Sequence, residues 1–218
     1  MIQMLITFEG IDGTGKTTLV RKLGASFPGS VVTREPLDKE FIKQHSYSPM
    51  GEIFAYMLDH AKHSHWLEAI NDTHLIFCDR YSDSRAAYQS CRLFIPYQFI
   101  QNLHFNSVEP DHTYILNIDV NTAISRLLNR DGKYFFTDKR YDTDAEYNKA
   151  LGLYMYELIR VKNKYLEIAA EYPDSYTVLD VTNMTEIEVV EFIENDILTR
   201  YGDDLTKWGV VKSIGLKG

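Results

Sequence analysis

The segment with the clearest chemistry runs from Gly10 to Thr17 and reads Gly-Ile-Asp-Gly-Thr-Gly-Lys-Thr. It matches the pattern G-x-x-x-x-G-K-[ST], in which glycines let successive backbone N–H groups turn toward a phosphate. Lys16 adds a positive charge for the phosphates, and Thr17 adds a hydroxyl that suits Mg²⁺. An apolar run precedes this segment and a helical pattern follows it, as the mechanism requires. We therefore interpret it as a phosphate loop rather than as a glycine-rich turn with a chance lysine.

The phosphate loop alone does not separate ATP-using enzymes from GTPases. A GTPase would also carry Asn-Lys-x-Asp to bind guanine, but the Asn-Lys pairs at 148–149 and 163–164 are followed by Leu151 and Leu166 in place of aspartate. We therefore predict ATP as the bound nucleotide. The residues expected to contact it are Gly10, Gly13, Gly15, Lys16, Thr17 and Thr18.

A second charged group, Asp79-Arg80-Tyr81, directly follows the apolar run 74–78. Ligands of open α/β sheets bind at the carboxyl ends of the strands, so these side chains are expected at such a site. Asp79 would hold Mg²⁺ together with Thr17, and Arg80 would neutralise charge between a donor and an acceptor phosphate. The plainer alternative is an Asp-Arg ion pair at a strand end.

The segment Thr33-Arg34-Glu35-Pro36 repeats this arrangement after another apolar run. It places Arg34 and Glu35 on the same rim of the expected sheet as Arg80. Two arginines on one rim predict an anionic acceptor. The alternative is a turn in which proline ends the strand and both charges are solvated.

Short apolar runs alternate with longer segments of helical period along the chain. This alternation predicts a parallel sheet flanked by helices, because parallel strands need long crossover connections. Helix starts are marked by capping residues at Ser48-Pro49, at Thr143 to Glu146 and at Thr185 to Glu188. The expected strands cover residues 4–8, 30–33, 74–78, 113–118 and 176–179.

Length and composition favour one main domain. A chain of 218 residues with 44% hydrophobic and 25% charged residues is long enough to bury one large core. We assign residues 1–200 to this domain and, within it, the Arg-, Lys-, Gly- and Asp-rich segment 130–142 to a mobile lid. Residues 201–218 lose clear periodicity and are expected to form a C-terminal tail.

The overall charge excludes two classes of partner. A formal net charge of −8 would repel both a nucleic-acid backbone and an anionic membrane, so neither a nucleic-acid polymer nor a membrane is expected as a partner.

The N-terminus has no basic leader, and no apolar stretch approaches the length of a membrane span. The two cysteines, Cys78 and Cys91, are too few for a disulfide framework. We expect a soluble cytoplasmic protein.

Taken together, three segments resemble the signatures of the thymidylate kinase family. They are Phe8 to Thr18, Thr33 to Pro36, and Asp79-Arg80-Tyr81 followed by Ala87-Tyr88-Gln89, and the likeness extends from about Ile2 to Leu198. The resemblance implies an α/β P-loop NTPase fold with a five-stranded parallel sheet of order 2-3-1-4-5. It also implies a homodimer that transfers the γ-phosphate of ATP to dTMP with Mg²⁺, in dTTP biosynthesis.

The resemblance also implies individual roles on the acceptor side. Asp12 should lie near the 3′-hydroxyl of the acceptor, Arg34 and Arg80 near its phosphate, and Tyr88 against the 2′ position, where its ring would exclude a ribose hydroxyl. An alternative for Tyr88 is simple packing of its ring beside the helix. The expected substrate-binding residues are Asp12, Arg34, Glu35, Tyr56, His60, Arg80, Arg85, Tyr88 and Gln89.

The chain departs from the family pattern in the expected base pocket. The family carries Phe-x-x-x-Arg on the helix before the Asp-Arg strand, with the ring on thymine and the arginine at its carbonyl, and here Tyr56 and His60 stand at those positions. Arg85 stands where a small polar residue is usual, with Gln89 one turn beyond it. Arg85 would compensate for His60, suit another base such as guanine or a modified pyrimidine, or be solvated.

Gly13 occupies a loop position where some relatives place a catalytic arginine, so the transition-state cation is expected from the lid. Arg130 and Arg140 are the candidates. Closure of the lid would exclude water from the reaction. The expected catalytic residues are Lys16, Arg80, Asp12, Arg130 and Arg140.

Three other functions remain as alternatives. A deoxynucleoside monophosphate kinase of broader or altered base specificity would accept dGMP, dUMP or a modified pyrimidine. A deoxynucleoside kinase would phosphorylate a 5′-hydroxyl and need a carboxylate base, and the arginine pair Arg34 and Arg80 disfavours it. A module that binds ATP without transferring phosphate would need no acceptor pocket. A metal site at His60, His63 and His65 is disfavoured because their spacing offers no further ligand.

Overall fold

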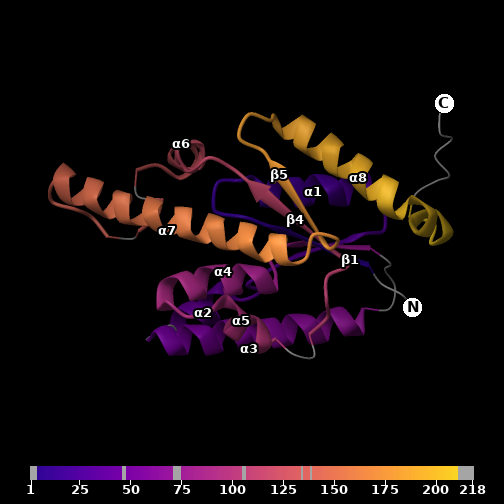
Figure 1. Ribbon diagram of the computed structural model, residues 1–218, viewed down its shortest axis with the longest axis horizontal. Coiled ribbons are helices and arrows are strands. Elements are labelled where there is room, and N and C mark those ends of the chain that lie inside the picture. The colour runs from indigo at the N-terminus through magenta and orange to yellow at the C-terminus, as the bar shows by residue number, and fades with distance from the viewer. Residues whose placement is uncertain are drawn as a thin grey trace.

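The protein is described by a computed structural model that covers residues 4–45, 48–70, 75–104, 107–133, 135–137 and 139–210. Five parallel strands form one sheet, ordered β2-β3-β1-β4-β5 (Figure 1). This confirms the predicted order, and each strand lies within two residues of its predicted bounds, although His74 lies outside the described residues. The strands are β1 (Met4–Glu9), β2 (Val31–Arg34), β3 (Leu75–Asp79), β4 (His112–Asn117) and β5 (Tyr176–Asp180).

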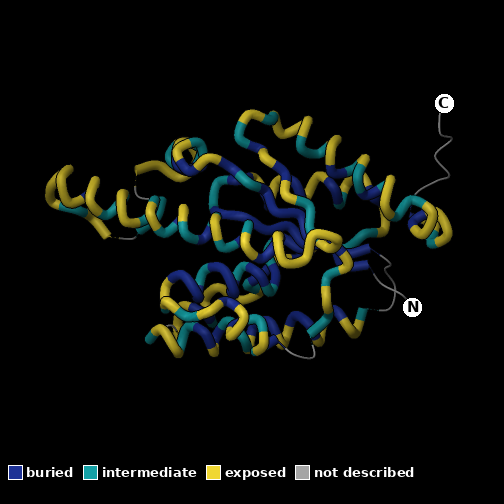
Figure 2. Tube along the Cα trace, in the orientation of Figure 1, coloured by how far each residue is buried: buried dark blue, intermediate teal, exposed yellow. Residues whose placement is uncertain are grey.

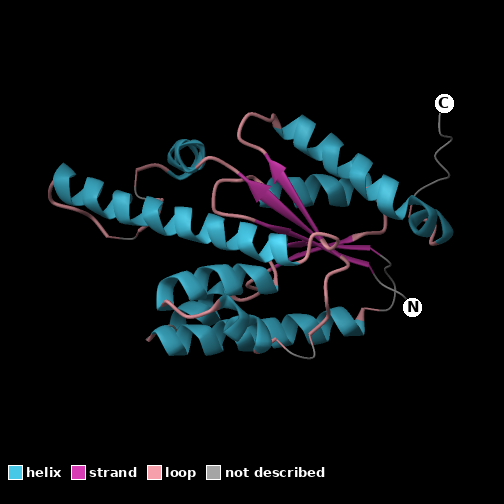
Figure 3. Cartoon of the chain, viewed as in Figure 1, coloured by secondary structure: helices cyan, strands magenta, loops and turns pink. Residues whose placement is uncertain are grey.

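Helices cover both faces of this sheet (Figure 3). Helix α1 contacts α8 on one face, whereas α4 contacts α3, α5 and α7 on the other. This three-layer arrangement confirms the predicted α/β class. The helices are α1 (Lys16–Ser26), α2 (Lys39–His45), α3 (Pro49–Ala69), α4 (Ser82–Leu93), α5 (Tyr97–Asn102), α6 (Val120–Asp131), α7 (Asp144–Glu171) and α8 (Glu186–Lys207).

The predicted capping residues begin three of these helices. Ser48 Oγ accepts from the backbone N–H of Gly51 before α3, at 3.0 Å. Thr143 Oγ1 accepts from the N–H of Glu146 before α7, at 3.2 Å. Thr185 and Glu188 form the full reciprocal capping box before α8. Each cap satisfies N–H groups that a helix leaves unpaired at its start, which explains why these boundaries were readable from sequence.

The core lies in the central strands, which are the most deeply buried part of the chain (Figure 2). Phe8 of β1 stacks on Tyr114 of β4 with ring centroids 5.5 Å apart, and it packs beside Phe77 of β3 at 6.1 Å. All three side chains are fully buried. Because β1 and β3 are held rigidly on both sides, the loops at their carboxyl ends start from well-defined positions.

The predicted boundary between domain and tail is wrong for residues 201–207. These residues continue α8 to Lys207, and Leu205 is fully buried in the main core cluster. Residues 211–218 lie outside the described part of the chain. No described helix is long and apolar enough to span a bilayer.

The predicted lid, residues 130–142, connects α6 to α7, and the end of α6 takes up its first residues. Arg130 lies in the last turn of α6 rather than in a loop, and residues 134 and 138 lie outside the described set. The ring of Phe136 stacks on Tyr154 of α7, with centroids 5.4 Å apart. The side chain of Phe135 meets the same tyrosine edge-on at 5.8 Å. These two residues of the predicted lid are therefore packed against α7 through their aromatic rings.

Candidate active site

The phosphate loop joins β1 to α1 as predicted. Gly15 precedes α1 with φ 94°, in the left-handed region that glycine adopts without a steric penalty. Lys16 is buried, and its Nζ donates to the carbonyl oxygens of Gly10 and Ile11 at 2.9 and 2.8 Å and to Thr14 Oγ1 at 3.1 Å. The side-chain nitrogen of Lys16 is thus held over the loop that leads into α1, the arrangement that binds phosphate.

Gly13 is required by sterics, which explains why no arginine stands there. Its φ is +86°, and a Cβ at this position would lie 2.7 Å from the backbone oxygen of Ala123 in α6. Any side chain would force the loop away from α6. A side-chain cation at this position of the loop is therefore excluded by sterics.

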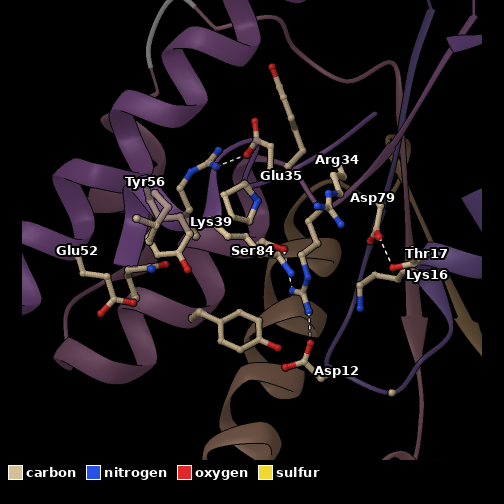
Figure 4. A pocket seen from close by; sticks show the side chains of 18 of the residues that line it. Asp12, Lys16, Thr17, Arg34, Glu35, Lys39, Glu52, Tyr56, Asp79 and Ser84 are labelled. Atoms are coloured by element: carbon tan, nitrogen blue, oxygen red, sulfur yellow. Dashed lines mark hydrogen bonds and ion pairs between the residues drawn. The ribbon is translucent and has the colours of Figure 1, made fainter. Parts of the chain in front are cut away.

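Thr17 and Asp79 approach each other across the sheet edge and form a site with metal-binding chemistry (Figure 4). Thr17 Oγ1 donates to Asp79 Oδ2 at 2.5 Å, whereas Asp79 Oδ1 is buried with no hydrogen-bond partner. An unpaired buried carboxylate oxygen beside a hydroxyl suits Mg²⁺, which takes one or two protein oxygens and fills its remaining positions with phosphate oxygens and water. Among the described residues no group of three or more His, Cys, Asp or Glu side chains could hold a metal on its own.

Arg80 lies between the two predicted phosphate sites. Its Nη2 donates to Asp12 Oδ1 at 2.5 Å (Figure 4), and its Nη1 donates to Ser84 Oγ at 3.2 Å. The guanidinium also lies 5.3 Å from the centroid of the Tyr88 ring. Its backbone adopts φ 69°, a left-handed conformation that is uncommon for arginine and is typical of functional loops. Arg80 is therefore held rigidly by both strand-end loops.

Glu9 was not among the predicted site residues, but its carboxylate holds the residues that follow Arg80. Its carboxylate accepts from the N–H of Tyr81 at 2.7 Å, from Ser84 Oγ at 2.5 Å and from the hydroxyl of Tyr165 at 3.0 Å. Burial is the main cause that raises the pKa of Glu9 to about 7. The only sequence signal was an acidic residue at the end of an apolar strand, where a buried carboxylate requires partners.

Both predicted phosphate sites open into one cavity of about 650 Å³ at the carboxyl ends of β1, β2 and β3 (Figure 4). Helix α3 contributes Tyr56 to its wall. The structure thus brings most of the predicted site residues together. Those that line this cavity are Asp12, Gly13, Gly15, Lys16, Thr17, Thr18, Arg34, Glu35, Tyr56, Asp79, Arg80, Arg85, Tyr88, Gln89 and Arg130.

His60 does not line the cavity, which corrects its predicted role in binding the base. Its side chain is only 2% exposed, and both ring nitrogens are used. Nδ1 contacts Glu35 Oε1 at 2.8 Å, and Nε2 contacts Ser107 Oγ at 2.9 Å. Burial is the main cause that lowers the pKa of this imidazole, followed by the charge of Arg85. His60 is a neutral structural residue behind the cavity wall.

Glu35 lines the cavity, but its carboxylate is occupied by other side chains. Oε1 accepts from His60 and His63, each at 2.8 Å, and Oε2 pairs with Arg85. Burial opposes ionisation, but the nearby Arg85 guanidinium and the two imidazoles hold the pKa of Glu35 well below its usual range. In this arrangement Glu35 acts on the cavity by orienting Arg85.

The two lid arginines are placed differently. Arg130 lines the cavity from the end of α6 and pairs with its neighbour Asp131 through two contacts, at 2.8 and 2.5 Å. Arg140 is not among the residues that line the cavity. Gly10 does not line it either, although its carbonyl oxygen accepts from Lys16. Of the two candidates for a lid cation, Arg130 is the one near the phosphate loop.

A family model for thymidylate kinase matches residues 8–193. The chain belongs to the thymidylate kinase family. It is 33% identical over 211 residues to a probable thymidylate kinase of Methanocorpusculum labreanum, an alignment that covers 89% of this chain and 97% of the relative. It is 30% identical over 217 residues to the thymidylate kinase of Trichlorobacter lovleyi, covering 90% and 98%.

Solved structures of thymidylate kinases share the fold. The enzyme from Candida albicans superposes with a TM-score of 0.69 at 21% identity, covering 91% of this chain and 92% of that chain. The enzyme from Ehrlichia chaffeensis gives 0.60 at 23% identity, covering 89% and 99%. The described core and its connections are therefore those of the thymidylate kinase fold.

Proposed function

We propose that this protein is an ATP-dependent kinase that converts dTMP to dTDP and so supplies dTTP biosynthesis. The observation that carries the proposal is the single cavity in which the Lys16 phosphate loop faces the arginines Arg80 and Arg34. One cation group suits the donor phosphates and the other suits the phosphate of the acceptor. Relatives named thymidylate kinase, which align over almost the whole chain, support this assignment.

In the proposed reaction, a 5′-phosphate oxygen of dTMP forms a bond to the γ-phosphorus of ATP while the bond to the β–γ bridging oxygen breaks. The attacking oxygen is already deprotonated, so no general base is needed. Lys16 and Arg80 neutralise charge on the transferred group, and Arg130 adds a cation from the lid side. The Asp79 and Thr17 oxygens would hold Mg²⁺, which neutralises phosphate charge and aligns the donor.

Asp12 and Tyr88 define the expected sugar site. Asp12 keeps its carboxylate at the cavity, and its contacts with Arg80 and Tyr154 fix its orientation. In the proposed complex this carboxylate accepts from the 3′-hydroxyl of the acceptor. The ring of Tyr88 lies beside Arg80 and leaves its own hydroxyl buried without a partner. A ring at this position would crowd a 2′-hydroxyl, which favours deoxynucleotides.

A coupled assay of ADP formation tests this function. Wild-type protein should turn over dTMP and ignore thymidine, and Lys16→Ala should lower kcat by about 10²-fold or more, since it removes a charge from the transferred phosphate. Turnover of thymidine would indicate a nucleoside kinase. ADP formation that does not depend on any nucleoside monophosphate would indicate an ATP-binding module without an acceptor.

We include a homodimer and a reducing, cytoplasmic setting in the proposal. Helix α3 exposes a stripe of apolar side chains at four-residue intervals, Met50, Phe54 and Leu58, each about half exposed. Such a stripe is suited to burial against a second copy. Light scattering should give a dimer mass for the wild type and a monomer mass for Phe54→Asp. Phe94→Asp, at a more exposed site, is the control.

The proposed reducing, cytoplasmic setting is supported by the two cysteines, both of which are free.

A further inference from the structure

Helix α4 carries an arginine whose hydrogen bonds are incomplete. The side chain of Arg85 is 4% exposed and borders the cavity. Its Nη1 pairs with Glu35, and its Nε donates to His104 Nε2 at 3.0 Å. Its Nη2 is buried and has no hydrogen-bond partner. A buried donor without a partner is costly, so this nitrogen is either a destabilising feature or a ligand contact.

Gln89 lies one helical turn further along α4 and has the opposite chemistry. Its side chain is also 4% exposed and borders the same cavity. Its Oε1 is buried and has no hydrogen-bond partner. Residues four positions apart lie on one face of a helix, so the same face of α4 carries a buried unpaired donor and a buried unpaired acceptor at the cavity. Tyr56 of α3 and Tyr88 line the cavity beside them.

We propose that Arg85 and Gln89 read the edge of the acceptor base, with Arg85 donating to the C4 carbonyl and Gln89 accepting from N3–H of thymine or uracil. The inference rests on the proposed function, because it concerns the acceptor of that reaction. Cytosine presents the reverse pattern, an amino donor at C4 and an acceptor at N3. The amide of Gln89 can rotate to suit either pattern, but a guanidinium has no acceptor, so Arg85 is the discriminating side chain.

The surroundings of Arg85 fix it in the orientation that this role requires. Glu35 stays ionised and holds Nη1, while Glu35 itself is held by His60 and His63. His104 stays neutral, since burial and the nearby guanidinium lower its pKa to about 2, and its Nε2 therefore remains an acceptor for Arg85. A donor held in this way does not have to be ordered when the base binds. The cavity wall thus replaces the arginine that the family carries on α3 with one from α4.

The sharpest test compares dUMP with dCMP, which differ only at position 4 and the protonation of N3. For the wild type we expect kcat/KM, and affinity measured by calorimetry without ATP, to favour dUMP by about 10- to 100-fold, the range for a hydrogen bond from a charged group. Equal affinity for the two nucleotides would overturn the proposal. This binding comparison does not depend on phosphoryl transfer, so it remains decisive if the proposed function fails.

Variants then assign the preference to Arg85. Arg85→Ala should lower kcat/KM for dUMP and dTMP by about 10- to 100-fold and leave that for dCMP within about 3-fold of wild type. Arg85→Lys keeps a charge for Glu35 but loses the planar fork, and it should also reduce the dUMP to dCMP ratio. Arg160→Ala, on α7 outside the cavity, should leave the ratio unchanged.

The same variants separate base reading from a structural role. If Arg85 only stabilises the wall, both substitutions will lower turnover of dUMP and dCMP by the same factor, and the proposal is then wrong. Should Arg85→Ala fail to fold, Arg85→Lys and the wild-type binding comparison still decide it. Absence of transfer to dTMP in the wild type would count against the proposed function, whereas transfer without dUMP over dCMP selectivity would count against this inference alone.

Discussion

The hydroxyl of Tyr154, in the middle of α7, donates a hydrogen bond of 3.3 Å to Asp12 Oδ2 in the phosphate loop. The other oxygen of the same carboxylate accepts from Arg80. The ring of Tyr154 in turn carries the stacked ring of Phe136 from the lid. Asp12 is therefore oriented by two elements at once, and one of them is in direct contact with the lid. The packing of the lid and the position of a carboxylate in the active site are linked through one side chain.

Removing this hydroxyl should lower turnover without changing the fold. We expect Tyr154→Phe to reduce kcat for dTMP by about 5- to 30-fold, because a hydrogen bond to a charged group is lost while the stacking on Phe136 remains. Steady-state kinetics would measure it. Tyr156→Phe, on the exposed side of the same helix, is the control and should behave as wild type. An unchanged kcat in Tyr154→Phe would show that Asp12 needs only Arg80.

Binding of ATP should be accompanied by proton uptake at Lys16. Burial, followed by the charge of Arg80, lowers the pKa of Lys16 to about 7, against the opposing influence of Asp12, Asp79 and Glu9. At pH 8 the free protein therefore holds Lys16 mainly neutral, and the phosphates of ATP favour its charged form. At pH 6 the side chain is already protonated, so no uptake is expected.

Calorimetry in two buffers of different ionisation enthalpy measures this uptake. At pH 8 the observed binding enthalpy should differ between Tris and HEPES by nearly the difference in their ionisation enthalpies, which corresponds to almost one proton per site. At pH 6, in two buffers that titrate near that pH, such as MES and bis-Tris, Lys16 should contribute no difference. Identical enthalpies at pH 8 would show that Lys16 is charged before ATP arrives, and that its contacts with the loop carbonyls hold an ammonium ion.

Removing the negative charge of Asp79, whose Oδ1 has no hydrogen-bond partner, should weaken Mg²⁺ binding. In Asp79→Asn the Mg²⁺ concentration for half-maximal rate is expected to rise by about 10-fold or more, because the carboxylate that faces Thr17 becomes a neutral amide. A magnesium titration at saturating ATP and dTMP measures the change. Asp174→Asn, at an exposed loop, is the matched control. An unchanged midpoint would remove Asp79 from the metal site.

The end of α8 should contribute to global stability. Leu205→Ala is expected to lower the free energy of unfolding by about 2–5 kcal/mol, as for other fully buried leucines, because it opens a cavity in the main core. Urea denaturation would measure the loss. Lys207→Ala, at the exposed last position of the helix, should change stability by less than about 0.5 kcal/mol. An unchanged stability in Leu205→Ala would show that the end of α8 does not contribute to the stability of the core.

Features with local causes were readable from the sequence. The phosphate loop depends on glycines and one lysine within eight residues, and the caps at Ser48 and Thr185 depend on side chains that reach only three residues ahead. The strands followed from continuous apolar runs, which a central parallel strand buried on both faces requires. The same local reasoning failed after Tyr201, because the buried side chains there, Leu205 and Val210, are too few and too far apart to give a clear period.

The roles of His60, Arg85 and Tyr154 were decided only by the tertiary structure. The helical spacing that placed His60 one turn from Tyr56 was correct, but the closeness of Glu35 and Ser107 turned its ring away from the cavity. Tyr154 lies 142 residues from Asp12, and no pattern within α7 distinguishes it from the other tyrosines of that helix. The sequence by itself determined the phosphate chemistry and the positions of the strands, because both arise from short-range geometry and from the burial of each strand. The order of the strands was an expectation from the resemblance to the thymidylate kinase family, because pairing between strands depends on contacts distant in the sequence. Which side chains face the acceptor was determined by packing between α3, α4 and α7, because contacts distant in the sequence decide which buried polar atoms are already paired and which are left for a ligand.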